Sequence, residues 1–221
     1  KEKVFNRIDC LLPDTNKIAS SMRYSALADS KCIRAGLIFA SGNLNKEISN
    51  SALIDMAASI ELMHTYSLIH DDLPSMDNDE MRRGQASNHI KFNEATAILT
   101  GDALQALAYE NIVSSPEITQ SQKIASIKAL SNACGHEGMI LGQQYDLDAE
   151  NNDYKDIKKI HELKKFTLIP KTPTISKKEE SYNKTKLVRE KIADLFEKGI
   201  TASMLVSYVI DKTKFFENYI I

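Results

Sequence analysis

The sequence predicts an all-α protein. Only 8 of its 221 residues are glycine and 5 are proline, whereas the helix-forming residues Ala, Leu, Ile, Lys and Glu are plentiful. Apolar residues recur at helical spacing in several long stretches, and no segment alternates convincingly as a strand. Because this length is enough for one sizeable core, we expect residues 1–221 to form a single domain.

The clearest helix is predicted over Ser51–Leu73. Ser51 can cap its N-terminus, and apolar residues follow at helical spacing. Pro74 disfavours helical backbone at Leu73 and should end the helix there. Four further helices are predicted on the same grounds, over Glu94–Val113, Gln120–Gly142, Asp153–Lys165 and Glu179–Gly199, the last with a glycine at its C-terminal cap.

Composition disfavours several classes of partner. The net charge of −2 and the pI near 6.3 give no reason to expect nucleic acid or an anionic membrane as the main partner. The three cysteines Cys10, Cys32 and Cys134 indicate neither a disulfide framework nor a zinc site, so we expect buried thiols. With no apolar run long enough to span a membrane and no signal-peptide core, we expect a cytoplasmic protein without stable membrane insertion.

The most informative stretch places clustered carboxylates just before paired arginines, as Asp71-Asp72-Leu-Pro-Ser-Met-Asp77-Asn-Asp-Glu-Met-Arg82-Arg83. Carboxylates this close repel one another unless a cation offsets their charge. Magnesium takes one or two carboxylates and leaves its other positions to water and substrate phosphate. Arginine can hold phosphate oxygens bidentately. The stretch therefore predicts a combined site for metal and phosphate.

Helical spacing places His64, Ser67 or Leu68, and Asp71 on one face of the predicted helix. Pro74 breaks that helix, so the chain can loop back and bring Asp77 toward Asp71. A solvated acidic helix end with neighbouring ion pairs would also explain such a run.

The run Asp71-Asp72-x4-Asp77 followed by Arg82-Arg83-Gly84 resembles the first aspartate-rich motif of the trans-isoprenyl diphosphate synthases, in particular the bacterial farnesyl diphosphate synthases. The resemblance covers roughly residues 15–165. Further matches along the chain are Met22-Arg-Tyr24, Lys31-x-x-Arg34, the lead-in His64-Thr-Tyr66-Ser-Leu-Ile-His70, Gly101-Asp102-Ala-Leu and Gly142-Gln143-x-x-Asp146-Leu147.

This resemblance implies an isoprenoid synthase-type helical bundle around a central cavity, usually dimeric, with three magnesium ions. The implied reaction joins isopentenyl diphosphate to dimethylallyl or geranyl diphosphate and gives farnesyl diphosphate. No nucleophilic side chain takes part. Asp71, Asp72 and Asp77 would be metal-binding and catalytic residues, and Arg82 would act beside them on the allylic diphosphate.

The resemblance also assigns substrate residues. Tyr66, with its neighbour Ser67, stands where an aromatic limits chain growth, which favours a farnesyl over a geranylgeranyl product, although a plain core tyrosine fits the same spacing. Gln143 matches a position facing the hydrocarbon, and Lys164 matches the lysine of a His-x-x-Lys motif. The residues matched to the isopentenyl diphosphate site are Lys31, Arg34, His64 and Arg83, with Arg82 adjacent.

The sequence departs from the family in two places. The usual Gly-Gly-Lys-Arg-x-Arg-Pro appears as Asp29-Ser-Lys-Cys-Ile-Arg-Ala35, which keeps two cations and loses both glycines. The second aspartate-rich motif, Asp-Asp-x-x-Asp, is absent, and a segment is missing between about residues 165 and 171. We expect the intact gene product to contain it; otherwise the protein could not assemble the full metal cluster.

Three other functions compete. A non-catalytic helical partner of an active prenyl synthase would not need the second motif, and a geranylgeranyl diphosphate synthase would share most of the residues above. A metallophosphohydrolase of the HD type is suggested by His64 and His70-Asp71. That class would not require Arg82-Arg83-Gly84, Lys31 or Arg34, so the sequence disfavours it.

Overall fold

The computed structural model describes residues 1–42, 48–150, 156, 160 and 163. The described residues fall into two compact units, one within residues 1–117 and the other within residues 118–173. The helices predicted over Asp153–Lys165 and Glu179–Gly199 lie outside the described residues, apart from three positions of the first. Lys164 and the junction between residues 165 and 171 also lie outside them.

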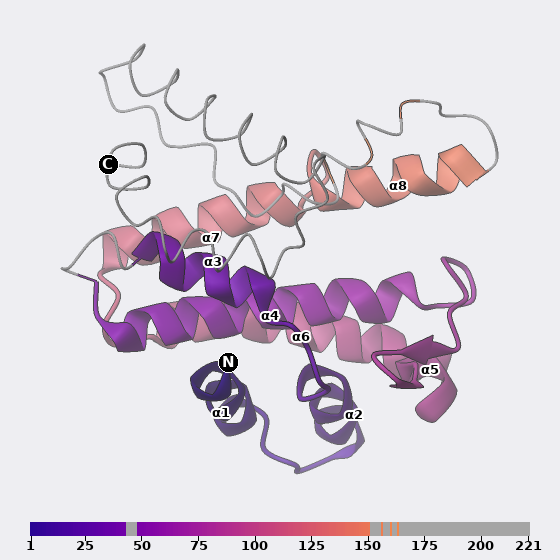
Figure 1. The fold of residues 1–221 in the computed structure, drawn as a ribbon, viewed down its shortest axis with the longest axis horizontal. Coiled ribbons are helices and arrows are strands. Elements are labelled where there is room, and N and C mark those ends of the chain that lie inside the picture. Colours follow the sequence, from indigo (N-terminus) through magenta and orange to yellow (C-terminus); the bar gives the residue numbers. More distant parts are fainter. Residues whose placement is uncertain (43–47, 151–155, 157–159, 161–162, 164–221) are drawn as a thin grey trace. The chain divides into compact units, whose positions relative to one another are not determined.

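The first unit is built on two long helices that run side by side, α4 (Asn50–Asp71) and α6 (Glu94–Ser114), as Figure 1 shows. Shorter helices pack against this pair: α1 (Glu2–Leu11), α2 (Lys17–Ala26), α3 (Ile33–Gly42) and α5 (Asn88–Lys91). The all-α prediction is confirmed, and the core consists of apolar side chains from α1, α4 and α6. Its largest fully buried members include Ile8, Leu62, Met63, Leu104 and Ile112.

The predicted boundaries of α4 are slightly wrong at both ends. Ser49, not Ser51, caps the helix, because its hydroxyl accepts a hydrogen bond from the Ala52 N–H at 3.1 Å. The helix ends at Asp71 rather than Leu73. Pro74 disfavours helical backbone at Leu73, and the regular helix already ends two residues before Leu73. α6 matches its prediction to within one residue.

A buried polar cluster joins α1, α4 and α6. Asp55 of α4 is 4% exposed and forms an ion pair with Arg7 Nε at 2.8 Å. Its Oδ2 also accepts a hydrogen bond from the Ser115 hydroxyl. Asn111 donates to the Asp55 carbonyl at 2.8 Å and to the Ser59 hydroxyl at 2.9 Å. Because a buried charge is costly unless it is paired, these partners fix the packing at the first half of α4.

The second unit contains α7 (Gln120–Cys134) and α8 (Met139–Glu150). The single helix predicted over Gln120–Gly142 is therefore wrong. Gly135 adopts extended backbone and ends α7, and Gly138 then donates to the Gly135 carbonyl in a turn. Two glycines within four residues favour such a break over continued helix.

Two further expectations are modified. Within the part of the chain that the structure describes, Cys32 and Cys134 are buried but Cys10 is exposed, contrary to the prediction. A short hairpin of β1 (Met81–Arg82) and β2 (Gln85–Ala86) was not predicted. Among the described helices, none has the length and apolar character needed to cross a membrane.

Candidate functional site

The second half of α4 presents one face that is only partly covered. His64, Ser67, Leu68 and Asp71 are half-buried, whereas Met63, Thr65, Tyr66 and Ile69 between them are buried. The predicted shared face is therefore present. Ser67 donates its hydroxyl hydrogen to the His64 carbonyl at 2.8 Å, and the Tyr66 ring packs edge-on against His70, with centroids 5.1 Å apart.

The acidic segment folds back at the end of α4, as the sequence predicted. The Asp77 N–H donates to the Asp71 carbonyl at 2.9 Å, which closes the chain into a compact loop around Pro74. Asp77 is exposed and Asp71 is half-buried. The loop therefore brings the backbones of two predicted metal-binding residues together at the rim of the α4 face.

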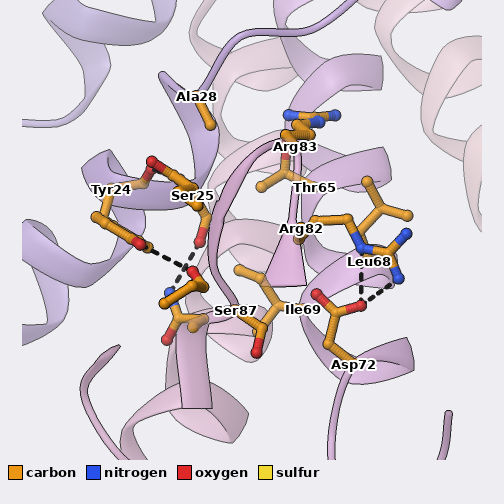
Figure 2. Close-up of a pocket in the computed structure, with 13 residues that line it drawn as sticks. Tyr24, Ser25, Ala28, Thr65, Leu68, Ile69, Asp72, Arg82, Arg83 and Ser87 are labelled. Carbon is orange, nitrogen blue, oxygen red and sulfur yellow. Dashed lines mark hydrogen bonds and ion pairs between the residues drawn. The ribbon is translucent and has the colours of Figure 1, made fainter. Parts of the chain in front are cut away.

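Asp72 differs from Asp71 and Asp77 in its environment. It is only 2% exposed, and its Oδ1 forms an ion pair with the Arg82 guanidinium. Arg82 Nε donates to this oxygen at 2.8 Å, and Arg82 also contacts Asp79 at 2.9 Å. Burial raises the pKa of Asp72 despite the arginine, while the hydrogen bond to Asp72 raises the pKa of Arg82. Figure 2 shows Arg82 pointing toward Asp72 and Arg83 pointing away from it.

The two arginines diverge because they lie on a tight β-hairpin. Arg82 pairs with Gln85, and the turn residues Arg83 and Gly84 have φ of 53° and 79°. Positive φ at both central positions is the backbone of a type I′ turn. A glycine adopts this conformation freely, but Arg83 adopts it at a cost of about 1 kcal/mol.

Tyr24 of α2 holds this hairpin in place. Its hydroxyl donates to the Ala86 carbonyl at 2.8 Å, and its own carbonyl accepts from Gln85 at 3.1 Å. A pocket lies between α2, α4 and the hairpin, and Thr65, Asp72 and Arg82 are among the residues that line it (Figure 2). Sequence reasoning noted Tyr24 as part of a motif but gave it no role, since nothing in its local sequence indicates a partner sixty residues away.

His64 lies among three positive charges. Burial, followed by the charges of Arg34, Arg83 and Arg82 in that order of size, lowers its pKa from 6.5 to about 3. Arg34 comes from the first turn of α3, and the other two come from the hairpin. The structure therefore brings together four of the predicted substrate residues. Lys31, two residues before α3, is exposed.

The altered loop before α3 has an unusual backbone. Cys32 has a φ of 47°, which is strained for a residue with a side chain, and its sulfur lies 3.1 Å from the Ser30 hydroxyl. Burial raises the pKa of the Cys32 thiol. Asp29, at the start of the loop, forms an exposed ion pair with Lys1. The loop that lacks the family's two glycines therefore has its positive φ at Cys32.

Two other predicted site residues belong to other parts of the chain. Gln143 lies on α8 in the second unit, where its side chain is half-buried, and Lys164 lies outside the described residues. His70, noted for a metallophosphohydrolase, donates from its Nε2 to the Ile98 carbonyl of α6 at 3.0 Å. No three acidic, histidine or cysteine side chains among the described residues are grouped to hold a metal ion.

The geometry defines a class of helical protein in which an acidic loop at the end of one long helix lies beside arginines from a neighbouring helix and a short hairpin. A family model described as polyprenyl synthetase matches residues 15–220, and the chain belongs to this family. The fold is the all-α isoprenoid synthase fold.

Named relatives agree with this membership. Farnesyl diphosphate synthase of Escherichia coli (strain K12) is 41% identical over 172 residues, which are 76% of this chain and 57% of that protein. The same enzyme of Buchnera aphidicola (subsp. Acyrthosiphon pisum) is 41% identical over 155 residues, 69% of this chain and 54% of the relative. The chain thus spans about half the length of the curated relatives that it matches.

Solved structures give the same result. The apo structure of an FPP/GFPP synthase from Zymomonas mobilis superposes with a TM-score of 0.71 at 35% identity, covering 76% of this chain and 63% of that one. A geranyltransferase from Legionella pneumophila superposes with a TM-score of 0.70 at 31% identity, covering 98% of this chain and 87% of that one.

Proposed function

We propose that this protein is a magnesium-dependent prenyltransferase that joins isopentenyl diphosphate to dimethylallyl or geranyl diphosphate and releases farnesyl diphosphate. The observation that carries this proposal is the acidic loop at the end of α4, where Asp77 returns to Asp71 and Arg82 pairs with Asp72. His64 lies on the same α4 face, close enough to Arg34, Arg83 and Arg82 for their charges to lower its pKa. Three guanidinium groups near one imidazole form a site for a strongly charged anion such as diphosphate.

The acidic residues suit magnesium that arrives with a diphosphate. Because no preformed group of three ligands exists among the described residues, one or two carboxylates and the substrate oxygens would share the coordination. We assign Asp71 and Asp77 to this role. Asp72 has its Oδ1 engaged by Arg82, which leaves Oδ2 as the oxygen it can offer. Bound magnesium, three ions in the full site, would stabilise the charge that develops on the departing diphosphate.

The side chains of this chain then have distinct tasks. Arg82 lies beside the carboxylates and binds the allylic diphosphate, while Lys31, Arg34 and Arg83 bind the diphosphate of isopentenyl diphosphate. His64 is neutral at physiological pH and can donate one hydrogen bond there. The allylic C–O bond breaks with its electron pair leaving on diphosphate, the double bond of the second substrate attacks the cation, and the released diphosphate accepts the lost proton.

Tyr66 is the residue that we propose to limit product length. It is 7% exposed on α4, five residues before Asp71, and its ring is fixed against His70. A rigid aromatic at the base of a hydrocarbon pocket would stop growth at the farnesyl stage. A geranylgeranyl diphosphate synthase of Capsicum annuum is also similar, 40% identical over 146 residues, so chromatography of the prenyl product separates the two possibilities.

We also propose that the protein forms a homodimer. Ile98, Leu99 and Val113 expose apolar surface along α6, at 44%, 55% and 53%, and such surface favours association. A second candidate function, a non-catalytic partner of an active synthase, is favoured by the absence of a second Asp-Asp-x-x-Asp motif from the sequence. It predicts no turnover by this protein alone and turnover in complex with an active subunit.

The test is incorporation of labelled isopentenyl diphosphate into an acid-labile prenyl product. The unsubstituted protein should be active with magnesium, and Asp71→Ala should abolish incorporation while leaving the helical circular dichroism spectrum intact. Glu80→Ala removes an exposed neighbouring carboxylate and serves as the matched control, with near-normal activity. Normal turnover by Asp71→Ala, or none by the unsubstituted protein, would contradict the proposal.

A further inference from the structure

Glu61 is a buried carboxylate near the middle of α4 to which the proposed mechanism gives no task. Glu61 is only 5% exposed to solvent. Burying a carboxylate is unfavourable unless hydrogen bonds or opposite charges compensate for the lost hydration. The partners of Glu61 therefore indicate what it does.

The hydrogen-bond partner of Glu61 is the start of α3. Glu61 Oε1 accepts a hydrogen bond from the Ala35 N–H at 3.0 Å. Ala35 is the third residue of α3, and the first N–H groups of a helix have no carbonyl partner within it. A negative charge is also favoured at this end by the helix dipole. Glu61 thus caps α3 from a different helix.

This contact joins the segments that bear the cationic cluster. Arg34 lies immediately before Ala35, and His64 lies one turn after Glu61 on the same side of α4. Glu61 also acts on the hairpin: its negative charge partly offsets the burial that lowers the pKa of Arg83. One carboxylate therefore acts on α3 and the hairpin from the helix that carries His64.

The residue at position 35 makes this contact possible. In the family pattern given above, proline stands at this position, and proline has no N–H to donate. Here Ala35 supplies the donor. The contact accompanies the absence of both family glycines from the preceding loop, in which Cys32 has a φ of 47°.

We propose that Glu61 is a positioning residue, which holds the first turn of α3 against α4 so that Arg34 and His64 face the same anion. The inference rests on the diphosphate binding in the proposed function. It predicts a selective effect on isopentenyl diphosphate, because the allylic diphosphate is assigned to Arg82 and the acidic segment, which Glu61 does not contact.

Three variants separate this role from a merely structural one. Glu61→Ala removes the acceptor, whereas Glu61→Gln keeps a side-chain oxygen for the Ala35 N–H and removes only the charge. Asp55→Asn is the matched control, since Asp55 is an equally buried carboxylate on α4 whose partners are Arg7 and Ser115. KM is measured for both substrates, binding of inorganic pyrophosphate is measured by calorimetry, and all assays are run well below the melting midpoint.

Glu61→Ala should raise KM for isopentenyl diphosphate about tenfold and weaken pyrophosphate binding, as expected for one lost hydrogen bond to a charged group. KM for the allylic substrate should change far less. Glu61→Gln should recover most of the loss, and Asp55→Asn should lower the melting midpoint without altering the ratio of the two KM values.

The inference is overturned if Glu61→Ala shifts both KM values equally, or if Glu61→Gln is as impaired as Glu61→Ala. These outcomes leave the proposed function intact. If the unsubstituted protein shows no prenyl transfer but binds pyrophosphate, and the variants weaken that binding in the stated order, the proposed function fails and the positioning role stands. Absence of both turnover and pyrophosphate binding overturns both.

Discussion

At the scale of single residues, the site is shaped by charges that the structure pairs selectively. Asp71, Asp72 and Asp77 look equivalent in the sequence, yet only Asp72 is buried, and its carboxylate is engaged by Arg82. Arg83, the next residue, points away from Asp72, and the negative charge of Glu61 acts on its pKa. Neighbouring residues of one type therefore serve different parts of the site.

Removing the Arg82 guanidinium should destabilise the fold. Arg82→Met leaves the Asp72 carboxylate buried without its cation, and we expect the free energy of unfolding in urea to fall by about 1–3 kcal/mol. Asp79→Asn removes the exposed partner of the same arginine and should lower it by less than about 1 kcal/mol. Equal losses in the two variants would show that the burial of Asp72 does not determine how much Arg82 contributes to the free energy of unfolding.

His64 should make stability depend on pH. Its folded pKa of about 3 lies below the ordinary value of 6.5, so the unfolded chain binds a proton between these values and the folded protein does not. The contribution of neutral His64 is therefore fully present above pH 6.5 and is lost as the pH falls toward 3. Urea unfolding at several pH values should show the unsubstituted protein losing stability faster than His64→Gln below pH 6.5. Parallel curves would contradict the assignment.

At the scale of elements, the site depends on where regular structure stops. α4 ends at Asp71, the chain returns through the Asp77–Asp71 hydrogen bond, and the hairpin then presents Arg82 and Arg83 in opposite directions. The sequence predicted the break from Pro74. It did not predict the hairpin, because strands of two residues are too short for alternation to be recognised.

The contact between α4 and α6 at the acidic end relies on Gly101. A Cβ at this position would lie 2.2 Å from His70 Nε2, and His70 directly precedes Asp71. Gly101→Ala should therefore lower the free energy of unfolding by about 1–3 kcal/mol. The double variant with His70→Ala should lose less than the sum of the single losses, because the opposing ring is gone. Strict additivity in urea unfolding would argue against this contact.

At the scale of the whole molecule, the candidate site is assembled from α3, α4 and the hairpin, whose residues are far apart in sequence. This assembly is held by apolar burial between α4 and α6 and by polar contacts such as Arg7 with Asp55. Among the described residues, no preformed group of three metal ligands holds this assembly together.

Metal removal should therefore leave the fold intact and abolish the proposed activity. With EDTA, the melting midpoint should shift by less than about 2 °C, which is at most about 1 kcal/mol for a chain of this size, while prenyl transfer ceases. Magnesium together with inorganic pyrophosphate should then raise the midpoint, since a ligand that binds only the folded state stabilises it. Unfolding by EDTA alone would identify a structural metal instead.

The sequence by itself determined the helical class, the family, and the shared face of His64 and Asp71, because helical periodicity and short motifs are local properties. It misjudged Gln120–Gly142, where a hydrophobic pattern continued across Gly135 and hid the break. It gave no role to Tyr24 or Glu61.

Only the tertiary structure decided which charges meet. Arg82 forms an ion pair with Asp72, Glu61 accepts a hydrogen bond from the first turn of α3, and Tyr24 donates one to the hairpin. The Glu61 and Tyr24 contacts span 26 and 62 residues of sequence and the Arg82–Asp72 pair spans 10. All three are at least partly buried, which reduces the competition of water. The spacing of residues in the sequence gives neither the distance between two segments in the fold nor the burial of their side chains. The pairing of charges is therefore decided only when the helices pack.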